Sequence, residues 1–319
     1  MIPLGDIGAP DSARKKAAVA IGNFDGLHLG HARLLKVLGR VSRTEGLRPV
    51  VLTFDPHPER ALGRGRTHMI QTLEQRLDLL CRWGLKNIVV TAFDARLARL
   101  TPREFMTRIL KNGLGAAAVV VGPDFRFGRG RAGTVDTLKT EGRSLGLRVL
   151  SVPQVRRGGR VVSSSLVRSL LARGRVEEAG RLLGRPYEVS GRVVPGRAVG
   201  RTLGFPTANI RSGNEILPRG VFITLVRVGR RLHPSLTNIG VRPTFGPGGL
   251  SLESLLLDFH GRLYGRRLDV LFLRKLRPER KFASPQALSR RIGQDIRSAR
   301  KYFASHQRTL AIPPPCNLF

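Results

Sequence analysis

One short segment near the N-terminus, residues 18–31, most constrains how this chain can fold. It reads Ala-Val-Ala-Ile-Gly-Asn-Phe-Asp-Gly-Leu-His-Leu-Gly-His, so an apolar, strand-like run leads into a stretch with three glycines and two histidines. Residues 32–38 continue with the apolar spacing of a helix. A strand, a tight turn and a helix start direct backbone N–H groups and the positive end of a helix dipole towards one point. The segment therefore predicts an anion site, and phosphate is the expected ligand.

The two histidines of this segment, His28 and His31, are three residues apart. At the start of a helix this spacing places them on nearly the same face, where both rings could contact one triphosphate. A metal pair or two solvated histidines are the alternatives. A zinc site, however, needs cysteines or further ligands nearby, and the surrounding sequence offers none. We therefore expect the pair to bind phosphate.

Three later segments carry polar residues where strands are expected to end. Thr-Phe-Asp-Pro-His-Pro follows the apolar run 49–52, and Gly-Pro-Asp-Phe-Arg-Phe-Gly follows the apolar run 119–121. Loops at the carboxyl ends of parallel strands bind ligands, which places Asp124 at the functional edge of the sheet. The third segment, Ser-Ser-Ser-Leu-Val-Arg at residues 163–168, precedes a helical pattern. Its serines could donate to an anion beside the forked cation of Arg168, or could simply cap the helix.

In this order, the four segments resemble the signatures of the bacterial bifunctional riboflavin kinase/FMN adenylyltransferase family. The resemblance implies an α/β N-terminal nucleotidylyltransferase domain with a Rossmann-like parallel sheet. It also implies that His28 and His31 stabilise the triphosphate of ATP and the transition state, and that Ser164, Ser165 and Arg168 bind the leaving phosphates. Asp124 and Phe125 are implied to bind or place the flavin, and Asp124 would help to place either the flavin phosphate or the metal. The other implied ATP contacts in this half are Gly22, Phe24, Asp25, Gly26 and Gly30.

The second half of the sequence has a different pattern. Short alternating apolar runs separated by Gly and Pro predict a small antiparallel β-barrel, and a helix is expected from residue 284 to 302. The expected strands are residues 187–194, 220–228, 252–259 and 267–273. We therefore expect an adenylyltransferase domain over 1–186, a riboflavin kinase domain over 187–305 and a disordered tail over 306–319.

A glycine-rich stretch, residues 196–204, lies between the first two of these strands. Closely spaced glycines let backbone amides approach a polyphosphate, although a barrel turn would also explain them. The Pro-Thr-Ala-Asn that follows resembles the riboflavin kinase motif. By that resemblance Thr207 and Asn209 hold Mg²⁺ with ATP oxygens, which suits their hard neutral oxygen atoms. The implied ATP contacts are Gly200, Arg201 and Gly204.

Glu253 lies in Leu-Glu-Ser-Leu-Leu-Leu-Asp-Phe, which resembles a strand of the same family. The resemblance makes it the base that takes the proton of the riboflavin 5′-hydroxyl, a role that a carboxylate can fill. A glutamate on the solvent face of a strand is the alternative. Two residues depart from the family pattern: Pro195 stands where many members have His, and Ser235 where Gly is more common.

The formal net charge of +34 raises a rival interpretation, an Arg-rich RNA-binding protein on a degenerate nucleotidylyltransferase scaffold. Only nine of the 56 basic residues are lysine, and the arginines are scattered rather than clustered. Aromatic residues make up 6% of the chain, which is few for base stacking. We therefore expect riboflavin, FMN and ATP as partners, with no specific nucleic acid and no membrane.

The two cysteines, Cys81 and Cys316, are far apart in the sequence, which fits a reducing compartment. No signal-like or membrane-spanning apolar run occurs in the sequence. We therefore expect a cytoplasmic enzyme that converts riboflavin to FMN and FMN to FAD, each with MgATP.

Overall fold

The central strand of the N-terminal sheet, β1 (Ala17–Ile21), is buried along its whole length, as expected for a parallel strand covered on both faces. In the computed structural model it pairs in parallel with β2 (Arg48–Asp55) on one side and β4 (Ala116–Val121) on the other. Strands β3 (Ile88–Ala92) and β5 (Arg148–Ser151) complete the order β3-β2-β1-β4-β5. The strand order reverses between β1 and β4, and open α/β sheets bind ligands at the carboxyl ends of their strands beside such a reversal.

Two apolar clusters cover the two faces of this sheet because alternate residues of β1 point to opposite sides. Ala18 and Ala20 belong to the cluster built with α1 and α3, whereas Val19 and Ile21 belong to the cluster built with α4, α6 and a π-helix, η1. The helical elements of this region are α1 (Leu29–Thr44), α2 (Pro58–Ala61), α3 (Leu73–Arg82), α4 (Ala95–Arg99), α5 (Pro102–Glu104), η1 (Phe105–Gly113), η2 (Arg129–Arg131) and α6 (Val135–Ser144). A short hairpin, β6 (Arg156–Arg157) and β7 (Arg160–Val161), ends this region.

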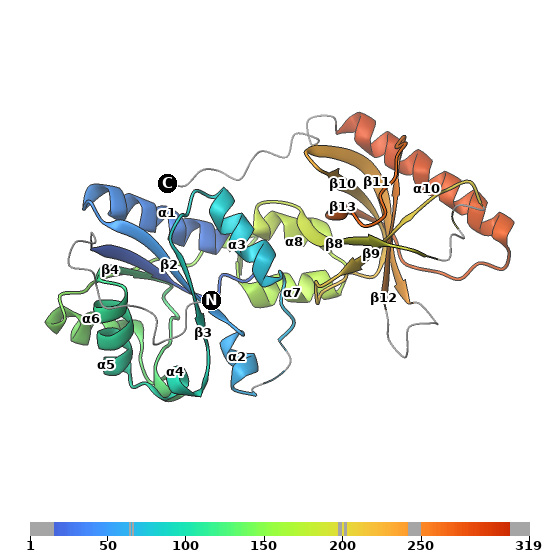
Figure 1. The fold of residues 1–319 in the computed structure, drawn as a ribbon. Coiled ribbons are helices and arrows are strands. Elements are labelled where there is room, and N and C mark those ends of the chain that lie inside the picture. The colour runs from blue at the N-terminus through green and yellow to red at the C-terminus, as the bar shows by residue number, and fades with distance from the viewer. Residues whose placement is uncertain are drawn as a thin grey trace. The chain divides into compact units, whose positions relative to one another are not determined.

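The structure describes residues 16–63, 65, 67–196, 200, 203–241 and 250–306, and these form two units (Figure 1). The first unit contains the parallel sheet and reaches Ser163, without residues 68–72. The second contains residues 68–72 and the described chain from Ser164 onwards. It therefore includes α7 (Ser164–Ala172) and α8 (Val176–Leu183). The expected domain boundary at residue 186 stays a prediction, and the expected tail lies outside the described residues from 307 onwards.

A closed antiparallel barrel forms the core of the second unit, as the alternating pattern predicted. Its strand order is β10-β11-β12-β9-β8-β13, and β13 pairs with β10 to close it. The strands are β8 (Tyr187–Val194), β9 (Ala208–Ser212), β10 (Gly220–Val228), β11 (Arg231–Val241), β12 (Leu250–Leu256) and β13 (Arg267–Arg277). Helix α8 packs against β8 and β13, and α7 packs against α8.

The four expected barrel strands are confirmed, but some of their boundaries are shifted. β12 begins at Leu250 rather than at residue 252, and β13 continues to Arg277 rather than ending at residue 273. Strands β8 and β10 have the expected ends, but β12 stops at Leu256 and the expected last residue was 259. The reason is a turn in which Asp258 adopts a left-handed backbone with φ of 54°, which an extended strand cannot continue. The sequence pattern did not predict β9 and β11.

The C-terminal helix α10 (Pro285–Ser305) is anchored to the barrel by a buried ion pair. Asp295, which is 3% exposed, accepts from Nε and Nη2 of Arg277 on β13 at 2.9 and 2.8 Å. Ser284 caps the helix by accepting from the N–H of Ala287 at 3.2 Å. The expected helix is therefore confirmed and continues a few residues further.

A chain of four hydroxyl groups crosses the interior of the barrel. Thr237 Oγ1 lies 2.8 Å from both Thr224 Oγ1 and Ser254 Oγ, and Thr224 Oγ1 lies 3.0 Å from Ser235 Oγ. All four side chains are fully buried, so their hydroxyls depend on one another for hydrogen bonds. Ser235 is one of the departures from the family pattern, and the barrel accommodates its hydroxyl as a donor to the carbonyl oxygen of Thr224 at 3.0 Å.

We predict that Thr237→Val lowers the free energy of unfolding of the barrel by about 1–3 kcal/mol, because it leaves a buried hydroxyl of Ser254 without its hydrogen bond. Adding Ser254→Ala to this variant should lower the free energy of unfolding little further, because the hydroxyl that has lost its partner is then removed. Urea unfolding of the two variants and the wild-type chain checks this. Equal stability of Thr237→Val and wild type would contradict it.

Candidate functional site

The turn that follows β1 is held in an unusual backbone conformation. Phe24 and Leu27 have φ values of 50° and 42°, and Gly26 between them has φ of 82°. The Phe24 ring is fully buried, and a Cβ atom built on Gly22 would lie 3.3 Å from it. Asp25 is also buried, at 1% exposed. This packing fixes the path of the chain from the reversal point of the sheet into α1.

His28 is the N-cap of α1. Its Nδ1 accepts from the N–H groups of Gly30 and His31 at 3.1 and 3.4 Å. The sequence predicted that first-turn N–H groups would face the anion, but these two are satisfied by the imidazole. Because Nδ1 is an acceptor, the proton of the neutral ring is on Nε2, which makes Nε2 a donor.

The rings of His28 and His31 stack on each other, with centroids 3.7 Å apart and an interplanar angle of 16°. The His31 ring also lies 5.2 Å from the Phe24 ring. A Cβ atom on Gly30 would lie 3.0 Å from Cε1 of His28, so glycine at this position leaves space for the stack. The structure thus brings both histidines together at the carboxyl end of β1, as their spacing predicted.

An aromatic cleft of about 300 Å³ lies at the carboxyl ends of the strands in the same unit. Gly22 and Asn23 line it at the end of β1, and residues of the β4–α6 loop line another side. The cleft contains five phenylalanines: Phe54, Phe93, Phe105, Phe125 and Phe127. Such a cleft suits a flat aromatic ligand. Of these, only Phe125 was predicted as a site residue from the sequence. Phe127 lies in the same loop, whereas Phe54, Phe93 and Phe105 come from three other segments.

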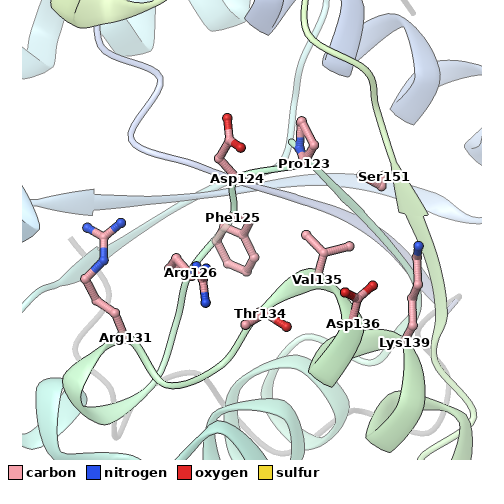
Figure 2. A pocket seen from close by; sticks show the side chains of 10 residues that line it. All are labelled: Pro123, Asp124, Phe125, Arg126, Arg131, Thr134, Val135, Asp136, Lys139 and Ser151. Atoms are coloured by element: carbon pink, nitrogen blue, oxygen red, sulfur yellow. The ribbon is translucent and has the colours of Figure 1, made fainter.

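Asp124 lies on the loop after β4, where its position in the sequence predicted it. It is exposed, and its carboxylate accepts from the side-chain amide of Gln154. Figure 2 shows this carboxylate directed away from Thr134 and Asp136 at the start of α6. Asp124 also lines both the aromatic cleft and an open pocket of about 530 Å³ on the α6 side. The loop is therefore a shared wall of two cavities.

Ser164, Ser165 and Arg168 lie in the first two turns of α7, which groups with the second unit. The chain that leads into α7 is still part of the first unit. There the carbonyl oxygen of Val162 lies 3.6 Å from a Cβ atom built on Gly30. Along the chain, α7 begins two residues after Val162.

The barrel carries a cavity of its own, of about 530 Å³, lined by Thr207 and Asn209 among others. A Cβ atom on Gly196 would overlap the amide of Asn209, and one on Gly200 would lie 3.3 Å from Thr207 Oγ1. Only glycine therefore allows the backbone to approach these two polar side chains. Gly204 is exposed with φ of 81°, and the expected Arg201 lies outside the described residues.

Glu253 on β12 is half-buried and stands directly opposite Asn209 of β9 in the antiparallel register. Residues opposite each other in such a pair project to the same face, with Cβ atoms about 4.5–5.5 Å apart. The structure therefore places the expected base beside one of the two expected metal ligands. On its other side Glu253 pairs with Asn238 of β11, which the sequence analysis did not select.

Arg76 of α3 is a further residue that the sequence analysis missed. Its side chain is 2% exposed and donates to backbone and side-chain oxygens at the ends of β1 and β2. The sequence shows only an arginine within an amphipathic helix. Because arginine is usually exposed to solvent, this pattern does not indicate a buried residue.

Comparisons with known proteins identify a family for each half of the chain. A family model for FAD synthetase matches residues 11–166, and one for riboflavin kinase matches residues 183–303. The bifunctional riboflavin kinase/FMN adenylyltransferase of Pseudomonas fluorescens is 40% identical over 88% of this chain and 91% of its own length. That of Escherichia coli K12 is 37% identical over 89% and 92%.

A solved structure also resembles the chain. The crystal structure of a macrolide-efflux protein from Streptococcus pneumoniae matches with a TM-score of 0.84 and 31% identity, over 94% of this chain and 99% of that one. Because both family models match and these relatives align along most of its length, the chain belongs to the bifunctional riboflavin kinase/FMN adenylyltransferase family.

Proposed function

We propose that the first unit transfers the adenylyl group and that the barrel transfers the phosphoryl group. The chain is a bifunctional enzyme of its family, which phosphorylates riboflavin to FMN and adenylylates FMN to FAD with release of pyrophosphate. The observation that carries the assignment of the first unit is the stacked His28–His31 pair in the same unit as a five-phenylalanine cleft. A polyphosphate site and a site for a flat ring both lie at the carboxyl edge of one sheet.

Adenylyl transfer needs no protein nucleophile, because a phosphate oxygen of FMN attacks the α-phosphorus of ATP and pyrophosphate leaves. Catalysis then consists of placing the reactants and neutralising charge. The Nε2–H of His28 and the stacked ring of His31 act on the triphosphate, beside the turn formed by Gly22, Phe24, Asp25, Gly26 and Gly30. Phe24 and Asp25 are buried, so their contribution is to hold this turn.

Ser164, Ser165 and Arg168 bind the departing phosphates in this proposal. Their support is the segment Ser-Ser-Ser-Leu-Val-Arg at residues 163–168, which resembles a signature of the family. Serine hydroxyls and a guanidinium fork donate hydrogen bonds to phosphate oxygens in the geometry that such anions require.

The flavin ring occupies the aromatic cleft in this proposal. The ring system of FMN is flat and largely apolar, and Phe125 and Phe127 stack nearly in parallel, with centroids 5.5 Å apart and an angle of 12°. Phe54 and Phe93 meet edge to face at 5.8 Å. Asp124 at the mouth of the cleft directs the polar end of the flavin.

In the barrel, Glu253 accepts the proton of the riboflavin 5′-hydroxyl as the γ-phosphoryl group of ATP is transferred. Thr207 and Asn209 offer the neutral oxygen donors that fit Mg²⁺, and the glycine backbone lies against both side chains. The ion, when bound, neutralises phosphate charge. Gly200, Arg201 and Gly204 belong to the loop that we assign to the phosphates of ATP.

We further propose that the enzyme works in the cytoplasm with riboflavin, FMN and ATP as its ligands, and without a specific nucleic acid or membrane partner. Among the described residues, no helix has the length and apolar character that a membrane span needs. The rival interpretation as an RNA-binding protein finds no support in the family models or in the relatives.

We predict that His31→Ala lowers the rate of FAD formation from supplied FMN by about 100- to 1000-fold, because a preorganised donor to the transition state is lost. Formation of FMN from riboflavin should stay at the wild-type rate. Chromatographic separation of the flavins after incubation with MgATP measures both. His306→Ala, at the exposed end of α10, is the matched control, and loss of both activities in His31→Ala would contradict independent sites.

Glu253→Gln should have the opposite effect. We expect FMN formation to fall by about 100- to 10,000-fold, because an amide cannot accept the hydroxyl proton, whereas FAD formation from supplied FMN persists. Glu177→Gln, an exposed glutamate on α8, should keep both activities. If Glu253→Gln phosphorylates riboflavin at the wild-type rate, another group is the base.

Thr207→Val should raise the Mg²⁺ concentration needed for half-maximal kinase activity by about tenfold, because one oxygen ligand is replaced by a methyl group. FAD formation by the same protein serves as the internal control and should keep its Mg²⁺ requirement. An unchanged Mg²⁺ requirement of the kinase reaction would remove Thr207 from the metal site.

A further inference from the structure

The buried guanidinium of Arg76 connects the ends of two neighbouring strands in the adenylyltransferase unit. Its Nη1 donates to the carbonyl oxygen of Asn23 at 2.6 Å, just after β1. The same nitrogen lies 3.3 Å from Thr53 Oγ1 and 3.4 Å from the carbonyl oxygen of Phe54, near the end of β2. The hydroxyl of Thr53 also donates to the carbonyl oxygen of Asn23, at 3.2 Å. One side chain thus joins the loops that leave β1 and β2.

The charge of Arg76 is held in an apolar interior. Burial lowers the pKa of Arg76, and the carboxylates of Asp25 and Asp55 oppose this shift. Nη2 lies 3.7 Å from the Asp55 carboxylate. Burying a cation is costly, and replacing a buried ion pair by apolar residues often does not destabilise a protein. Stability alone therefore gives a weak reason for an arginine at this position.

The loops that Arg76 joins carry the two halves of the proposed site. Asn23 follows Gly22 in the turn that leads to His28, and Phe54 is one wall of the aromatic cleft. The Asn23 side chain also contacts Nε2 of His57 at 2.8 Å, while Nδ1 of His57 accepts from the N–H of Glu59 at 3.3 Å. The connection therefore continues from Arg76 through Asn23 to the start of α2.

We propose that Arg76 is a positioning residue for adenylyl transfer, which fixes the nucleotide-binding turn after β1 relative to the flavin cleft at the end of β2. The proposal rests on the function assigned above to this unit. Attack of one bound phosphate on another depends steeply on alignment, and small displacements of either reactant lower the rate. Arg76 touches neither reactant; it acts through the backbone of Asn23 and Phe54.

Lysine is the most informative replacement for Arg76, because it keeps the positive charge but lacks the planar, forked arrangement of hydrogen-bond donors. A guanidinium presents several donors in one plane, whereas an ammonium is a point charge on a flexible stem. Lysine can stay near Asp25 and Asp55, but it cannot bridge the oxygens of Asn23 and Phe54 in the same way. The substitution Arg76→Lys therefore separates charge from geometry.

We expect Arg76→Lys to lower kcat of FAD formation by about tenfold or more while KM for ATP and for FMN stays within about twofold, because each half-site persists and their alignment is lost. The riboflavin kinase rate of the same preparation should be unchanged. Arg82→Lys, on the same helix with a surface ion pair to Asp78 at 2.8 Å, is the matched control and should behave as wild type.

The number of binding sites per chain, measured calorimetrically with ATP and FMN, distinguishes a loss of alignment between bound reactants from partial unfolding of the protein. A lower kcat with full site occupancy supports positioning, whereas a loss that matches the loss of sites shows a purely structural role and overturns the proposal. An unchanged kcat in Arg76→Lys also overturns it. If wild-type protein makes no FAD, the proposed function fails instead.

A second variant keeps the test decisive if Arg76→Lys does not fold. Thr53→Val has almost the same shape and removes one acceptor of Arg76 together with the hydrogen bond to Asn23. It should lower kcat in the same direction with unchanged site occupancy and by a smaller factor. Wild-type kcat in Thr53→Val would show that this connection does not set the alignment.

Discussion

The path from a fully buried strand into a helix is the constraint on which the adenylyltransferase unit depends. β1 is covered on both faces, so the chain must turn at once to begin α1 on the surface of the sheet. It does so with Phe24 and Leu27 in the left-handed region, which costs of the order of 1–3 kcal/mol per residue and persists only where the surroundings hold it. Burial of the Phe24 ring and the capping bonds to His28 hold it here. The same turn places the two imidazoles at the reversal point of the sheet.

The barrel positions its polar groups in a different way. Closure pairs every barrel strand with two neighbours, and the register places Glu253 opposite Asn209 without any contribution from sequence proximity. Inside, the hydroxyls of Thr237 and Ser254 bond to each other, so these buried polar groups have hydrogen-bond partners. Outside, the glycines at 196 and 200 let the backbone at these two positions lie against Asn209 and Thr207. In both sites, glycine thus lets the backbone lie close to a side chain of the proposed site.

Much of the fold was readable from periodicity, since both halves have clear patterns. The apolar runs predicted three of the five parallel strands, β1, β2 and β4, but not β3 and β5. β8 and β10 begin and end where the expected strands do. The short β9 was missed because its residues belong to a motif that resembles a loop. The end of β12 was misplaced because the left-handed Asp258 breaks a run that still looks apolar. The pairing of His28 with His31 followed from helical spacing alone.

By itself, the sequence determined the family and predicted the two types of site, because the motif residues proposed to bind phosphate or metal lie close together along the chain. Only the tertiary structure decided what lies between and behind them. The five-phenylalanine cleft gathers residues from separate segments, and the contact of Arg76 with Asn23 spans two elements that no local pattern links. Side-chain contacts across a sheet depend on register and packing, which periodicity along one strand or helix does not encode.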